Sequence, residues 1–143
     1  MSIFGQLREA IEQQTQRVRN RSFLEATMAT CALVTLADGV VTFPERIRID
    51  QMLESLTDLQ AFDPHQAIDL FNGYVEDLQE DPEKGHARAL AAVRAITDNP
   101  EASQLMLRIA YELSKADGAI TQSERQRIDE IARLLEIAPP TLP

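Results

Sequence analysis

The sequence predicts an all-α protein, a bundle of about seven helices with an internal pseudo-two-fold repeat of a helix–loop–helix unit. The first observation is a repeat, because fourteen residues starting at Ala37 return with nine identities starting at Ala116. The second is that apolar residues recur at helical spacing along most of the chain. The third is three Asx-Pro pairs, at 63–64, 81–82 and 99–100, which are typical helix starts and leave little room for strands.

Length and composition favour a single globular domain over residues 1–143. Hydrophobic residues make up 44% of the chain and charged residues 26%, as in ordinary soluble proteins. The net charge of −9 argues against nucleic-acid binding and favours basic or cationic partners. The single cysteine, Cys31, fits a reducing compartment. With no uninterrupted apolar segment for export or membrane insertion, we expect a cytoplasmic protein.

The first element, residues 1–21, is predicted to be an N-terminal amphipathic helix. Its charge differs from that of the remainder, since it has four Arg and two Glu, a net of +2, against ten basic and twenty-one acidic residues afterwards. A basic amphipathic helix can lie on a membrane surface, or it can dock on an acidic bundle through its apolar stripe. We favour docking because the stripe is short, so any membrane association is expected to be indirect.

Two repeated hairpins, residues 23–56 and 101–137, are predicted to form most of the bundle. The first helix of the first hairpin is apolar on nearly all sides between Ala26 and Ala37, which places it at the centre. Its counterpart is the helix predicted over 101–116, and we expect these two to be the core pair. The Asx-Pro starts predict two further helices between the hairpins, from 64 to about 78 and from 82 to about 97.

The loop of each hairpin has the residues that end one helix and begin the next. Gly39 and Gly118 are suited to closing the preceding helix, because a left-handed residue costs glycine little. Thr42 with Glu45, and Thr121 with Glu124, have the spacing of a capping box. These residues are therefore predicted to act as structural caps.

One residue of each loop lies where local electrostatics disfavour it. Asp38 and Asp117 follow the negative end of a helix dipole, where a carboxylate is unfavourable by roughly 0.3–1 kcal/mol. Two interpretations stay open: the carboxylates accept local hydrogen bonds, or they hold a cation or a basic partner. The spacing from Asp to Glu copies only the second half of an EF-hand loop, which supplies too few oxygens for a standard calcium site. A weak divalent-cation site shared by the two loops remains as a hypothesis.

The paired units, A-D-G-V-V-T-F-P-E from Ala37 and A-D-G-A-I-T-Q-S-E from Ala116, resemble the tellurite-resistance TerB family. The same domain type occurs in membrane-anchored DnaJ-like co-chaperones. The resemblance implies an all-helical bundle with internal symmetry and no enzymatic activity. It also implies a proposed metal site on clustered acidic residues, which here would be Asp38, Glu45, Asp117 and Glu124. The first copy departs from the second at Phe43 and Pro44, so the two loops are unequal.

Three classes of function follow. The first is a TerB-like cytoplasmic stress-response protein whose acidic loops bind a divalent cation or a protein partner. The second is a plain helical interaction module whose loop carboxylates only cap helices, and we rank capping above ion binding. The third, an enzyme, is disfavoured because no nucleophile–base pair is readable and His65 and His86 are interpreted as surface residues. An anionic surface would repel tellurite, so any role in resistance to it is expected to be indirect.

Overall fold

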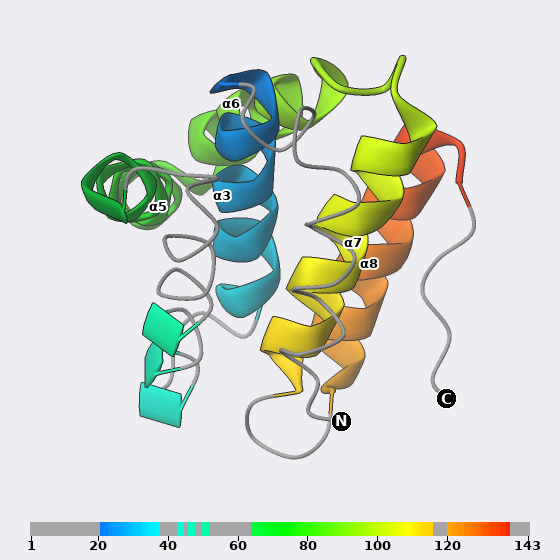
Figure 1. Ribbon diagram of the computed structural model, residues 1–143. Coiled ribbons are helices and arrows are strands. Elements are labelled where there is room, and N and C mark those ends of the chain that lie inside the picture. Colours follow the sequence, from blue (N-terminus) through cyan, green and yellow to red (C-terminus); the bar gives the residue numbers. More distant parts are fainter. Residues whose placement is uncertain are drawn as a thin grey trace.

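A computed structural model describes residues 21–37, 43–44, 46–47, 50–51, 64–115 and 120–137. Within these residues the protein is all-helical and has no strands, as predicted (Figure 1). Five helices have defined bounds: α3 (Arg21–Thr35), α5 (Pro64–Glu80), α6 (Pro82–Arg94), α7 (Pro100–Ser114) and α8 (Gln122–Leu135). The described residues between 43 and 51 are also helical. The predicted N-terminal helix lies outside the described residues.

Helix α3 is the centre of the bundle, as its apolar composition predicts. It contacts α5, α6, α7 and α8, and every residue from Ala26 to Thr35 is buried. The expectation of a core pair formed by α3 and α7 was too narrow, because α3 packs equally against α5 and α6. In Figure 1, α7 and α8 lie side by side and form an antiparallel hairpin on one flank of α3.

The starts of two helices follow the Asx-Pro capping chemistry that the sequence predicts. Asp81 caps α6, since its Oδ1 accepts from the backbone N–H of Lys84 at 3.2 Å. Asn99 does the same for α7, where its Oδ1 accepts from the N–H of Ala102 at 3.1 Å. In each case proline occupies the next position, where its missing N–H costs nothing. These caps fix where the chain turns between α5, α6 and α7.

Helix α6 ends at Arg94, about one turn before the predicted end near residue 97. Residues 95–98 form turns instead, and the backbone N–H of Asn99 donates to the carbonyl of Ile96 at 3.0 Å. The Ser103 hydroxyl of α7 donates to the same carbonyl at 3.1 Å. Helical backbone is disfavoured for Asn99 because it precedes Pro100, so α6 does not continue into α7.

Helices α5 and α6 approach each other at a glycine. A Cβ built on Gly85 of α6 would lie 2.7 Å from the carbonyl carbon and oxygen of Asp77 and from the nitrogen of Leu78, all of them backbone atoms of α5. Nearby, Arg88 forms an ion pair with Asp77 and lies 5.7 Å over the ring of Tyr74. Because Gly85 has no side chain, the backbones of α5 and α6 can pack closely against each other. The Arg88–Asp77 ion pair lies near this contact.

Candidate functional site

Most of the residues predicted for the acidic loops lie outside the described part of the chain. These residues are Asp38, Gly39, Thr42, Glu45, Asp117 and Gly118. Thr121 and Glu124 are described, and so are the ends of α7 and α8 that border the second loop. Within the described residues, no group of three or more His, Cys, Asp or Glu side chains is placed to hold a metal ion.

The structure contains a capping box at the start of α8. The Thr121 hydroxyl accepts from the N–H of Glu124 at 3.1 Å, and Glu124 Oε1 accepts from the N–H of Thr121 at 3.0 Å. The whole Glu124 residue is only 4% exposed. Its carboxylate is thus already used for the helix start, and binding a metal through Oε1 would cost the helix this hydrogen bond.

The border of the second loop also has basic side chains. The Lys115 ammonium lies 5.3 Å over the ring of Tyr111, and the Arg125 guanidinium lies 5.8 Å from the same ring centre. Lys115 also pairs with the carboxylate of Glu112 at 3.7 Å. Tyr111 itself is 1% exposed, and its hydroxyl has no hydrogen-bond partner among the residues that the structure describes. The charge beside this loop is therefore mixed, and not acidic alone as the loop residues predicted.

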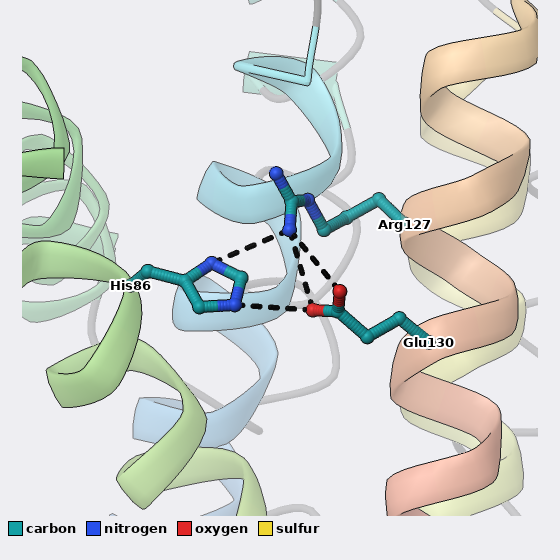
Figure 2. A network of polar contacts seen from close by, with 3 residues as sticks. All are labelled: His86, Arg127 and Glu130. Atoms are coloured by element: carbon teal, nitrogen blue, oxygen red, sulfur yellow. Dashed lines mark hydrogen bonds and ion pairs between the residues drawn. The ribbon is translucent and has the colours of Figure 1, made fainter. Parts of the chain in front are cut away.

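A second candidate site joins α6 to α8 through three polar side chains, as Figure 2 shows. His86 Nε2 lies 3.1 Å from Glu130 Oε1, and His86 Nδ1 lies 3.4 Å from Arg127 Nη1. Arg127 Nη1 also contacts the two carboxylate oxygens of Glu130, at 3.3 and 3.4 Å. We call these three residues the His86 network.

The hydrogen bonds of the His86 network determine which ring nitrogen carries the proton in neutral His86. A guanidinium can only donate, so the Nδ1 that faces Arg127 must accept. The other nitrogen, Nε2, then carries the hydrogen and donates to Glu130. The imidazole is thereby held between a cation and an anion, and its ring orientation is fixed by both.

A pocket of about 370 Å³ lies beside the His86 network. Its walls come from α3, α5, α6 and α8 and from the residue after the end of α3. The lining residues are Leu33, Leu36, Leu78, Gln79, Pro82, His86 and Arg127. Sequence reasoning interpreted His86 as a surface histidine and did not find this pocket. The readable signal was limited to Arg127 and Glu130, which are three residues apart on one helix face.

Comparison with known proteins decides the family. The family model described as "Tellurite resistance protein TerB" matches residues 24–142, most of the chain. A "Tellurium resistance protein TerB" from Alcaligenes sp. is 33% identical over 102 residues, which are 71% of this chain and 84% of the relative. The chain belongs to the TerB family. No solved structure matches it.

The TerB match begins at Leu24, near the start of α3, and continues beyond the end of α8. It therefore includes both acidic loops, the capping box at Thr121 and all three residues of the His86 network. The described part of this TerB-family chain has no helix that is long and apolar enough to cross a membrane.

Proposed function

We propose that this TerB-family chain is a non-enzymatic stress-response protein of tellurite-resistance type that acts in the cytoplasm. Its two acidic loops would bind a divalent cation or a protein partner. The observation that carries the proposal is the family match over residues 24–142, which includes both copies of the loop motif. An indirect role in resistance is favoured because an acidic surface repels an anion such as tellurite.

The proposal places the two loops in equivalent positions of a bundle of about seven helices with pseudo-two-fold symmetry. The α7–α8 hairpin is the described copy of the repeated unit. Its counterpart would be α3 followed by the helical residues between 43 and 51. The contact between α3 and α7, the first helices of the two copies, supports this arrangement.

Asp38 and Asp117 are the proposed principal ligands. Glu124 is a poorer candidate ligand, because its Oε1 accepts a hydrogen bond from the backbone N–H of Thr121 and the residue is buried. By the repeat, Glu45 would have the same capping role. Two aspartates with loop carbonyls would make a weak site, since Ca²⁺ takes about 6–8 oxygen ligands.

Thermal unfolding of metal-free protein tests the cation proposal. The wild type and an Asp38→Asn/Asp117→Asn variant are heated with and without millimolar Ca²⁺, Mg²⁺, Mn²⁺ or Zn²⁺. An ion at about 100 times its Kd should stabilise the wild type by about 2.7 kcal/mol and leave the variant unchanged. Asp98→Asn/Asp129→Asn, which neutralises two carboxylates elsewhere, is the control and should keep the full response. Equal shifts in all three proteins would argue for nonspecific screening and against the site.

The alternative is an interaction module in which the loop carboxylates only cap helices. The capping box of Glu124 favours it, and so do two exposed apolar residues next to the first loop. Phe43 is 76% exposed and Ile47, four residues later on helical backbone, is 41% exposed. This alternative predicts no stabilisation by any ion, together with an Asp38→Asn/Asp117→Asn variant that is destabilised equally in every buffer.

A further inference from the structure

The pocket beside the His86 network is lined by both apolar and polar residues. Leu33, Leu36, Leu78 and Pro82 supply the apolar walls, whereas Gln79, His86 and Arg127 supply the polar groups. Its volume of about 370 Å³ falls within the range of about 300–1,000 Å³ that is typical of small-molecule sites. An apolar pocket with a few convergent polar groups is the usual form of such a site.

Arg127 is held in place by groups that leave most of its donors unused. Its contacts within the described residues are to His86 and Glu130, and all of them use Nη1. A guanidinium has five N–H donors, so the Nε and Nη2 hydrogens are not used in these contacts. In Figure 2, Nη2 points away from both His86 and Glu130. The side chain is thus oriented in advance, which lowers the ordering cost of binding a ligand.

The charge of the lining selects the kind of group that Arg127 would bind. Among the described residues, none of those lining the pocket has a carboxylate. Glu130 contacts Arg127 and His86 but is not itself a lining residue. The described lining therefore has one permanent cation, Arg127, together with the polar side chains of Gln79 and His86. The planar guanidinium matches a carboxylate, which it binds through two parallel N–H···O bonds.

We propose that this pocket binds a small organic acid with an apolar body, such as a medium-chain or aromatic carboxylate. The carboxylate would pair with the Nε and Nη2 side of Arg127, and the apolar body would contact the leucines and Pro82. The protein's net charge of −9 repels small anions, so burial of the apolar body must supply most of the affinity. This site is separate from the proposed cation site, since it needs neither Asp38 nor Asp117.

Titration of the ¹⁵N-labelled full-length chain with acetate, butyrate, hexanoate and octanoate tests the proposal. Each methylene that enters the pocket should tighten binding about fourfold, until the pocket is full. Backbone amide shifts should cluster at Leu33, Leu36, Leu78, Gln79 and His86. Hexanamide, which has the same apolar body but no charge, should bind at least about tenfold more weakly than hexanoate, because hydrogen bonds to a charged group are the strong ones.

Substitutions at Arg127 separate recognition from nonspecific apolar binding. Arg127→Gln should weaken hexanoate binding at least about tenfold and bring it close to that of hexanamide. Arg127→Lys keeps the charge but loses the planar fork, so it should recover only part of the affinity. Arg133→Gln, on an exposed position of the same helix, is the matched control and should bind as the wild type does. The ¹⁵N spectrum of each variant without ligand shows whether its fold is intact.

Three results would overturn the proposal. The first is the absence of saturable shifts with octanoate at about 10 mM, which exceeds the Kd of even a weak specific site. The second is a set of shifts centred away from the pocket, for example around Phe43. The third is equal affinity for hexanoate in folded Arg127→Gln and in the wild type. A failure of any of these tests leaves the cation response of the loops unchanged, so the two proposals are judged separately.

Discussion

Replacement of Gly85 by alanine tests the close contact between α5 and α6. The added Cβ would lie 2.7 Å from three backbone atoms of α5, which belong to Asp77 and Leu78. A side chain could rotate away from such a contact, but a helical backbone cannot. The helices would therefore have to separate by a few tenths of an ångström or more along this contact.

Two opposing effects determine the expected change in stability. Alanine in a helix is favoured over glycine by about 1 kcal/mol. Overpacking costs about 1–3 kcal/mol and occasionally more, and a clash with backbone belongs at the upper end. We therefore expect Gly85→Ala to lower the free energy of unfolding by about 2 kcal/mol, which corresponds to a fall in Tm of roughly 4–8 °C.

Urea and thermal unfolding of Gly85→Ala and Gly73→Ala measure this effect against a matched control. Gly73 lies within α5, and a Cβ there would meet nothing within 4 Å. Gly73→Ala should therefore stabilise the protein by about 0.5–1 kcal/mol through helix propensity alone. If both substitutions stabilised the protein equally, the close approach of α5 and α6 at Gly85 would be refuted.

Two further predictions concern the helix cap and the buried thiol. Thr121→Ala should lower the free energy of unfolding by about 1 kcal/mol through loss of the cap, whereas Ser123→Ala, two residues later and exposed, should change it little in the same urea titration. Burial raises the pKa of Cys31 to about 12. The folded state binds the thiol proton more tightly than the unfolded state does. The free energy of unfolding that this proton contributes is therefore fully present below the unfolded pKa of about 9, and it is lost as the pH rises towards about 12. Unfolding at graded alkaline pH should show this fall in the wild type and less of it in Cys31→Ala, and equal pH profiles would contradict it.

The sequence predicts the elements whose causes are local. The apolar composition of α3 identifies it as the central helix because a helix without a polar face must be covered on all sides. The Asp81-Pro82 and Asn99-Pro100 pairs predict the starts of α6 and α7 because each cap acts within three residues. The capping box of α8 is local in the same sense. In all of these cases, the interacting atoms are near neighbours in the chain.

The features that the sequence did not predict depend on contacts between distant residues. His86 and Arg127 are 41 residues apart, and no periodicity or motif connects them. A histidine near a helix start is therefore indistinguishable from a surface residue until α6 and α8 are placed together. The same holds for Gly85. A glycine inside a helix indicates a close packing contact, but the sequence does not show which helix it contacts.

The capping box has a second consequence, because α8 connects the loop motif to the pocket. Glu124 and Arg127 are three residues apart on this helix, so they lie one above the other on neighbouring turns. The hydrogen bonds between Thr121 and Glu124 fix the first turn of α8, and Arg127 lies on the next turn. Near the first loop, Leu36 lines the pocket and lies two residues before Asp38 in the sequence. Residues close in sequence to both copies of the repeated motif therefore line the pocket.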